Sequence, residues 1–330
     1  MPVPTLTSIL KRILKQPTAP FHEYHVRDEI EAVLEDCPHV KIKRDGFDNL
    51  IVTYKNGKRK SRNAWVLGAH MDHPGFVRQP DLEDDWTFLG GMKPEIVEAG
   101  VEAGLRKIKG SIGTWKFPVK IADGQLHAAA CDDLVGCSII LSVIWDLASL
   151  DVETTFHAVF TRAEEVGFLG AWHVGQKWPF ADDAVFVSVE TSRPVNGAQI
   201  GGGPVVRVGD RLSVFDHAGV DALMRTATDQ GIRVQRGLLD AGACEASAIQ
   251  ACGRRAAGVS VLLGNYHNTT DEHEVAPEWV ALEDVKSTVA LLKALVATRD
   301  AGKIVRPMEE RVAVRMRDYA DFIKAAKKHF

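Results

Sequence analysis

The sequence predicts an α/β fold in which a mixed central sheet is flanked by helices and carries a small β-rich insertion. Short apolar segments alternate along most of the chain with longer segments of helical periodicity. This alternation is typical of a sheet whose strands are joined by helical crossovers. Between residues 76 and 125 it gives way to glycines and to short alternating runs such as residues 114–121, which are typical of antiparallel strands.

The N-terminal part of the chain is predicted to contain two helices and a pair of strands. Apolar residues at helical spacing predict helices over residues 6–14 and about 23–36. Residues 40–44 and 50–54 have the composition of two strands, and the turn between them contains Asp45-Gly46. This pair is expected at one edge of the sheet.

The rest of the chain supplies the other elements. Further strands are predicted at residues 64–69, 155–161, 184–189 and 257–263. Further helices are predicted at about residues 133–148, 217–229, 245–252, 278–298 and 308–328, of which the last is basic and most simply a solvated helix. We therefore assign residues 1–75 and 126–330 to one main domain, and residues 76–125 to an insertion that is a candidate for oligomerisation or substrate access.

Charge and composition exclude several classes of function. Hydrophobic residues make up 45% of the 330 positions and charged residues 25%, the balance of a soluble globular protein. A formal net charge of −4 predicts neither a nucleic-acid partner nor a membrane partner. The N-terminus lacks the pattern of a secretory signal, and the five cysteines form no C-x-x-C pair. We expect a cytoplasmic protein with reduced thiols.

Two candidate functional sites lie at the ends of predicted elements, one after a strand and one before a helix. His70 and Asp72 directly follow an apolar strand. In this arrangement an imidazole can bind a metal while the carboxylate holds the ring from behind, although H-x-D also occurs in ordinary polar loops. Asp132 and Asp133 precede an apolar helix, where adjacent acids often serve only as helix caps.

Three more candidates follow predicted strands. Glu164 and Glu165 end a strand that has little solvated face, so two adjacent carboxylates there are hard to explain as surface residues. Their natural roles are one metal ligand and one general base. Glu190 ends the next strand, and His267 follows the last one. Taken alone, a histidine in the place of His267 is more often a hydrogen-bonded structural residue than a metal ligand.

These candidates share one position in the predicted fold. An open α/β sheet gathers the carboxyl ends of its strands into one crevice. Two histidines and three carboxylates suit two divalent ions that share an oxygen ligand, and zinc, cobalt and manganese all tolerate this mixture. The sequence therefore predicts a two-metal hydrolase. The expected ligands are His70, Asp132, Glu165, Glu190 and His267.

The motifs resemble those of the glutamyl and deblocking (tetrahedral) aminopeptidases, a family of the co-catalytic dizinc exopeptidase clan. The resemblance rests on the Ala-His-Met-Asp, Cys-Asp-Asp-Leu-Val-Gly and Glu-Glu-Val-Gly-Phe-Leu-Gly-Ala segments, which begin at Ala69, Cys131 and Glu164. It covers almost the whole chain. It implies the phosphorylase/hydrolase-like fold of zinc exopeptidases, aminopeptidase activity on small peptides and a homo-oligomer, a dimer or larger. The chain departs from the family pattern at Glu190, where aspartate is usual, and at Leu134, where arginine is usual.

The resemblance also implies how the ligands are shared between two ions, with zinc the usual metal. Asp132 bridges both ions and is followed by a cis peptide bond. Glu165 completes the ligands of the ion held by His70. Glu190 and His267 hold the second ion.

The remaining site residues have roles outside the ligand set. The resemblance implies that Asp72 braces its histidine and that Glu164 is the general base. As a hypothesis, the ions activate a water bridged between them, and Glu164 takes the water proton and passes it to the departing amine. Glu245 is a further candidate, for the wall of the pocket that receives the free α-amine of the substrate.

Two other interpretations of the same residues stay open. One is an amidase, deacylase or carboxypeptidase on the same dimetal scaffold, because a fold does not fix a function. The short segment between Glu190 and His267 lacks room for the large insert of the deacylase branch, which favours an aminopeptidase. The other is a catalytically silent binding protein, against which the complete set of ligands and base argues.

Overall fold

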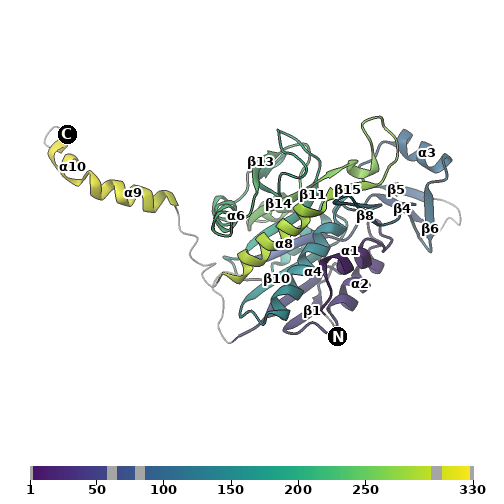
Figure 1. Cartoon of the computed structure of the whole chain (residues 1–330), viewed down its shortest axis with the longest axis horizontal. Helices are drawn as coiled ribbons and strands as arrows, with labels where there is room; N and C mark the ends of the chain where they lie inside the picture. Colours follow the sequence, from purple (N-terminus) through teal and green to yellow (C-terminus); the bar gives the residue numbers. More distant parts are fainter. Residues whose placement is uncertain (1–2, 58–64, 79–85, 299–306, 328–330) are drawn as a thin grey trace.

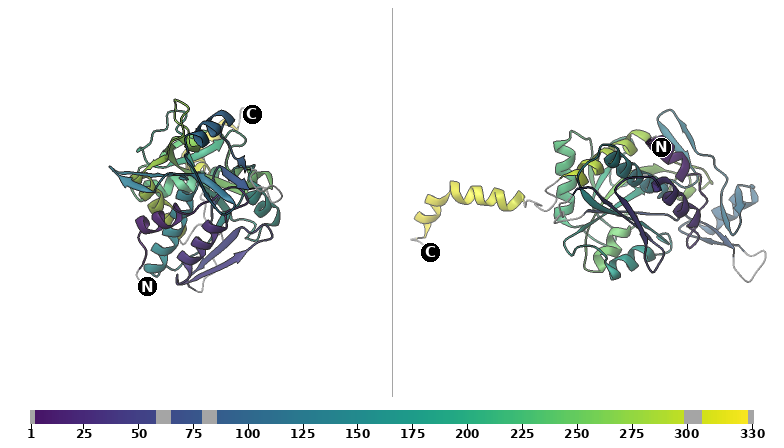
Figure 2. Two further views of the ribbon diagram at one scale, coloured as in Figure 1. Left: turned by 90° about the vertical axis from the view of Figure 1, so that its right-hand side faces the viewer. Right: turned by 90° about the horizontal axis from the view of Figure 1, so that it is seen from below.

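The computed structural model describes residues 3–57, 65–78, 86–298 and 307–327. Its body is a large mixed sheet flanked by helices, beside which lies a separate four-stranded antiparallel sheet (Figures 1 and 2). The predicted α/β class, with a mixed sheet and a small β-rich insertion, is confirmed.

Parallel strands form the centre of the large sheet. In spatial order they are β10 (Thr155–Thr161), β3 (Trp65–His70), β11 (Val185–Ser192) and β14 (Arg255–Gly264). Antiparallel strands extend the two sides, with β2 (Leu50–Lys55) and β1 (Val40–Arg44) beyond β10, and β15 (Glu278–Ala281), β9 (Gln125–Ala128) and β8 (Lys120–Ala122) beyond β14. A branch of β12 (Val205–Asp210) and β13 (Gln235–Leu239) also pairs with β14. Strands covered on both faces are continuously apolar, which explains why β3, β11 and β14 stand out in the sequence.

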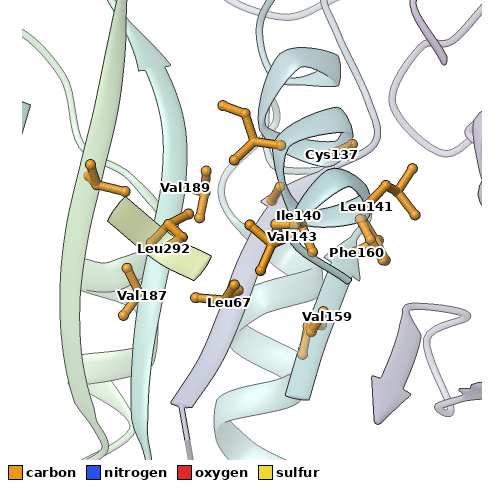
Figure 3. Packing of buried hydrophobic residues seen from close by; sticks show 14 of the residues in the cluster. Leu67, Cys137, Ile140, Leu141, Val143, Val159, Phe160, Val187, Val189 and Leu292 are labelled. Atoms are coloured by element: carbon orange, nitrogen blue, oxygen red, sulfur yellow. The ribbon is translucent and has the colours of Figure 1, made fainter. Parts of the chain in front are cut away.

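Helices cover the sheet and supply the core. They are α1 (Leu6–Ile13), α2 (Tyr24–Leu34), α4 (Leu134–Ser149), α5 (Leu169–Lys177), α6 (His217–Asp229), α7 (Glu245–Ala251) and α8 (Leu282–Ala297). Helix α4 is buried along nearly its whole length, as expected of a helix that is apolar all round. Figure 3 shows Ile140 and Val143 of α4 packed over Leu67 and Val187 of the sheet, with Leu292 of α8 beside them.

The insertion forms its own small sheet and core. Its elements are β4 (Gly75–Arg78), β5 (Trp86–Leu89), α3 (Pro94–Glu102), β6 (Arg106–Lys109) and β7 (Ile112–Trp115), and its strands are ordered β5-β4-β7-β6. Phe76, Met92, Ile96, Val97 and Trp115 make up a separate apolar cluster. Residues 120–125, which we placed in the insertion, pair instead with the large sheet through β8 and β9.

The structure differs from the sequence prediction in several elements. The helix expected from residue 278 begins at Leu282, because residues 278–281 pair as β15 with β14 and β9. Helices α3 and α5 were not predicted. The C-terminal helix is divided into α9 (Pro307–Asp318) and α10 (Ala320–Ala326), which project from the body (Figure 1). Within the described ranges, no helix is long and apolar enough to cross a membrane.

Candidate active site

Both histidines of the predicted ligand set lie against the carboxylate of Asp132. The Nε2 atom of His70 is 3.3 Å from Oδ1 of Asp132, and Nε2 of His267 is 3.7 Å from its Oδ2. His70 ends β3, whereas Asp132 directly precedes α4 and His267 lies in a single 3₁₀ turn after β14. The carboxyl ends of parallel strands therefore bring together residues nearly 200 positions apart, as the sequence predicted.

The two remaining carboxylates pair with the histidines in the order opposite to the one expected. Oε2 of Glu190 lies 3.9 Å from Nε2 of His70, and Oε2 of Glu165 lies 3.2 Å from Nε2 of His267. The order of the strands in the sheet explains which carboxylate lies near which histidine. β11 is the direct neighbour of β3 in parallel register, so Glu190 lies level with His70. Glu165 lies past the end of β10, on a loop that reaches the far histidine.

Asp72 holds two parts of the site together. Its carboxylate accepts hydrogen bonds from the backbone N–H groups of Glu164 and Glu165, each at 3.0 Å. The same side chain lies 3.5 Å from Nδ1 of His70, and the Asp72 carbonyl accepts from that nitrogen at 3.1 Å. Asp72 thus orients the histidine and also fixes the loop that carries both glutamates.

The segment at the start of α4 has the backbone that the family resemblance implied. The peptide bond between Asp132 and Asp133 is cis. Asp133 is the N-cap of α4, where its Oδ1 accepts a hydrogen bond from the N–H of Gly136 at 3.2 Å. Of the two acids, one is therefore a helix cap and the other points into the site.

The sequence analysis missed two residues that orient the ligands. Oε2 of Glu278 accepts hydrogen bonds from the N–H groups of Cys131 and Asp132 at 2.7 and 3.0 Å, and its Oε1 accepts from that of His267 at 2.9 Å. His73 contacts the Asp132 carbonyl through Nδ1 and the side chain of Asn268 through Nε2. His73 stood in the His70-Met-Asp72-His73 motif and could have been found there. Glu278 carried no signal, because its segment resembled the start of a helix.

The site buries more negative groups than positive ones. Burial is the largest cause that raises the pKa of Glu190 to about 7 and that of Glu278 to about 7. Burial also raises the pKa of Glu164 well above its usual value, with the charges of Glu190 and Glu165 adding to the shift. Burial acts on Asp132 as well, but the nearby imidazole of His70, whose Nε2 is 3.3 Å from Oδ1, outweighs it and lowers the pKa of that carboxyl. Such a cluster is stabilised by bound cations.

The donor atoms fit divalent metal ions. His70, Asp132 and Glu190 offer atoms within 4.8 Å of one another, and so do Asp132, Glu165 and His267. Several of these buried atoms have no hydrogen-bond partner, namely Asp132 Oδ1, Glu165 Oε1 and His267 Nε2. Because an unsatisfied buried polar atom is costly, atoms of this kind converging on one point are expected of a metal site. Mixed imidazole and carboxylate ligands suit zinc, cobalt or manganese.

A pocket opens beside these ligands. Its lining includes His70, Asp132 and Glu164 together with Arg193 and Arg207. The expectation for Glu245 needs correction. Its side chain is fully buried at the start of α7 and does not border this pocket. Burial, reinforced by the charge of Glu190, raises the pKa of Glu245 to about 8.

Comparison with known proteins was made for the sequence and for the fold. A family model described as M42 glutamyl aminopeptidase matches residues 93–291, a range that begins after His70 and includes the other four proposed ligands. A protein of Acetivibrio thermocellus with the provisional name of aminopeptidase is 24% identical over an alignment of 316 positions, which covers 82% of this chain and 92% of that protein.

Two solved structures with the same fold belong to archaeal peptidases. The TET1 peptidase of Pyrococcus horikoshii, which can assemble into a tetrahedron or a large octahedral shell, matches with a TM-score of 0.72 and 19% identity, covering 88% of this chain and 99% of its own. The TET aminopeptidase of Thaumarchaeota archaeon SCGC AB-539-E09 matches with a TM-score of 0.75 and 15% identity, covering 91% and 98%. At these identities the structures show that the fold is shared.

Proposed function

We propose that this chain, which belongs to the M42 glutamyl aminopeptidase family and is a metal-dependent aminopeptidase, removes single residues from the N-termini of small peptides with Glu164 as its general base. The observation that carries this proposal is the position of Asp132 between two histidine–carboxylate groups, with Glu164 lining the adjoining pocket. Aminopeptidase chemistry needs both a metal centre and a proton acceptor facing the same small space.

The proposed ligand set serves two divalent ions, which we take to be zinc. One ion is held by His70, Asp132 and Glu190, and the other by Asp132, Glu165 and His267, following the distances between their atoms. Asp132 offers one oxygen to each group, which suits a shared ligand. Cobalt and manganese are compatible with the same donors.

Glu164 is positioned to move the protons of the reaction. When bound, the ions supply Lewis acidity that activates water and polarises the scissile carbonyl. Glu164 accepts a proton from the attacking water on its carboxylate and delivers it to the departing nitrogen. Its pKa is raised, mainly by burial, which favours uptake of a proton by this carboxylate. The Asp72 carboxylate accepts a hydrogen bond from the backbone N–H of Glu164 and so fixes the backbone from which the Glu164 side chain extends.

The pocket wall favours an acidic side chain on the residue that is removed. Arg207 borders the pocket, is only 3% exposed and has a buried Nε atom without a hydrogen-bond partner. Its remaining contacts, to Ser260 Oγ and the Leu239 carbonyl, are long at 3.5 Å each. A guanidinium held this loosely retains donors for a carboxylate, and membership of a glutamyl aminopeptidase family agrees with this preference.

Assembly and location belong to the same proposal. The TET1 relative assembles into closed shells, and we propose that this chain also forms a homo-oligomer in the cytoplasm. The insertion, residues 76–125 without the segment 120–125 that pairs with the large sheet, is proposed to contribute to assembly or to limit access to the site. Peptides, and neither nucleic acid nor membranes, are its expected partners.

The test is metal-dependent release of N-terminal residues from a panel of free and N-acylated peptides. We expect release only from free-amine peptides. Glu164→Gln is expected to lower kcat roughly 100- to 10,000-fold, the usual contribution of a general base, while metal content stays the same. Cleavage confined to acylated peptides would indicate a deacylase. If metal is bound but no peptide of the panel is cleaved, the result would indicate a binding protein.

Arg207 has its own test within that panel. We expect Arg207→Gln to lower kcat/KM for N-terminal glutamate substrates at least tenfold relative to N-terminal leucine substrates, because a charge-assisted hydrogen bond is lost only with the former. An equal fall for both substrates would show that Arg207 serves only as a counter-ion to Glu190, whose pKa its charge lowers against the larger effect of burial.

A further inference from the structure

The insertion contacts the ligand cluster through Gly91. This residue lies between β5 and α3, and its carbonyl oxygen is 3.1 Å from Nδ1 of His267. A carbonyl can only accept a hydrogen bond, so Nδ1 carries the proton and donates it. Nε2 faces the carboxylates of Asp132 and Glu165 and is the nitrogen that could offer its lone pair to a metal ion there. A hydrogen bond to the far nitrogen is how proteins fix the tautomer and orientation of a metal-binding histidine.

Gly91 is required for space and not for backbone conformation. A Cβ atom at this position would lie 2.9 Å from both Cε1 and Nδ1 of His267, closer than real side chains come. Gly91 is not among the glycines with positive φ, whereas its neighbour Gly90 has a φ of 119° and packs on Pro74. The Gly90-Gly91 pair therefore fits between the segment after His73 and the ring of His267.

The position of the Gly91 carbonyl is set by the core of the insertion. Met92 follows directly and is buried with Phe76 and Trp115 in the apolar cluster of the small sheet. The first turn of α3 begins immediately afterwards, where the Lys93 carbonyl accepts hydrogen bonds from Ile96 and Val97. The contact with His267 thus depends on how this small domain is folded and seated.

We propose that Gly91 is a positioning residue for His267, and that the insertion thereby completes the binding site for the ion held by Asp132, Glu165 and His267. Its backbone carbonyl fixes the imidazole, and its missing side chain lets the two segments approach. The inference rests on the proposed role of His267 as a ligand. It makes the insertion a part of the metal centre, in addition to any part it has in assembly or access.

The first experiment adds the missing Cβ. Metal-free Gly91→Ala, titrated calorimetrically with zinc, is expected to bind one ion as the native protein does and the other roughly 10- to 100-fold more weakly, the usual cost of disturbing a group that orients a ligand. The matched control is Gly237→Ala, whose Cβ meets only one atom at an ordinary 3.7 Å and which should bind both ions normally. Equal affinities in Gly91→Ala and native protein would overturn the proposal.

A second variant separates positioning from a simple clash. Met92→Ala removes the anchor of the segment without placing any atom near His267, and it is expected to weaken the same ion. Ile108→Ala, on the 48% exposed side of the same insertion, should not. If Met92→Ala leaves both affinities unchanged, Gly91 only avoids a clash and positions nothing. If the native protein itself fails to bind two ions, the proposed ligand set is wrong, a result distinct from failure of the Gly91 inference.

Discussion

The two sides of a single strand show how differently this fold treats apolar and charged residues. Val187 and Val189 of β11 lie in the apolar layer between the sheet and helices α4 and α8 (Figure 3). The next residue, Glu190, belongs to the ligand cluster and is only 5% exposed. Side chains of a strand alternate between its faces, so a one-residue step separates the residues that stabilise the fold from those that do its chemistry.

The free-energy balance of the two regions is opposite. Each large apolar side chain that is fully buried stabilises the fold by about 1.5–3 kcal/mol. Each buried carboxylate costs free energy unless it is paired, and the site holds several. The apolar layer therefore stabilises a polar edge that is unfavourable by itself, and the edge is stabilised further only when cations bind. This difference yields predictions that separate the two regions.

Removal of metal should have the largest effect on the free energy of unfolding. A ligand present at 1,000 times its dissociation constant stabilises the native state by about 4 kcal/mol, so stripping two ions with a chelator should lower the free energy of unfolding by at least that amount. Urea denaturation with and without chelator measures it. An unchanged midpoint would mean that the edge is not held by metal.

The effect of the chelator should grow with pH. In the metal-free protein, burial raises the pKa of Glu190 and Glu278 to about 7 and that of Glu245 to about 8. A carboxyl whose pKa is raised by folding stabilises the native state below its ordinary value of 4.5, and this stabilisation is lost as pH rises through the folded value. Metal-free protein should therefore be less stable at pH 8 than at pH 5.5, and metal should suppress this dependence.

The next largest loss in the free energy of unfolding is expected from a cavity in the apolar layer. Leu67→Ala removes a fully buried side chain that packs under Ile140 and Val143 of α4. We expect a loss of about 3 kcal/mol in the free energy of unfolding, with kcat of the folded, metal-loaded protein nearly unchanged. Leu150→Ala, at a 66% exposed position, is the control and should change neither. A fall in kcat comparable to the loss of stability would contradict the separation of the two regions.

The contrast also explains what the sequence could reveal. Residues that act locally were found, because His70 ends an apolar strand and Glu164-Glu165 follow another, and both patterns are visible within a few positions. The distances place Glu190 near His70 and Glu165 near His267, the reverse of the expected pairing. That pairing depends on the spatial order of β10, β3 and β11, which no local pattern encodes.

Other parts of the site were missed for the same reason. Glu278 lies in β15, a strand that exists only through its pairing with β14 and β9, so its segment was taken for a helix. Gly91 acts through its backbone and through the absence of a side chain. Neither property distinguishes it from the other glycines of the insertion until the tertiary contacts are known.

Glu278→Gln tests whether Glu278 supports metal binding at the polar edge of the sheet. Glu278 accepts hydrogen bonds from three N–H groups, and an amide nitrogen in place of one oxygen cannot accept. We expect metal affinity and kcat each to fall roughly 10- to 100-fold, and Glu278→Asp to recover part of the loss. Glu283→Gln on the exposed face of α8 is the control. Unchanged metal affinity in Glu278→Gln would restrict Glu278 to a purely structural role.

The smallest effect is expected at His157, a polar residue placed in the sheet far along β10 from the site. Its Nδ1 contacts the Thr53 hydroxyl at 3.0 Å, and burial lowers its pKa from 6.5 to about 4. Because the unfolded chain takes up the proton first, stability is complete above pH 6.5 and is lost as pH falls toward 4. For metal-loaded protein we expect a loss of at most about 2 kcal/mol between pH 7 and pH 5. His157→Leu should remove this loss, whereas an identical slope in the variant would show that the acid sensitivity comes from groups other than His157.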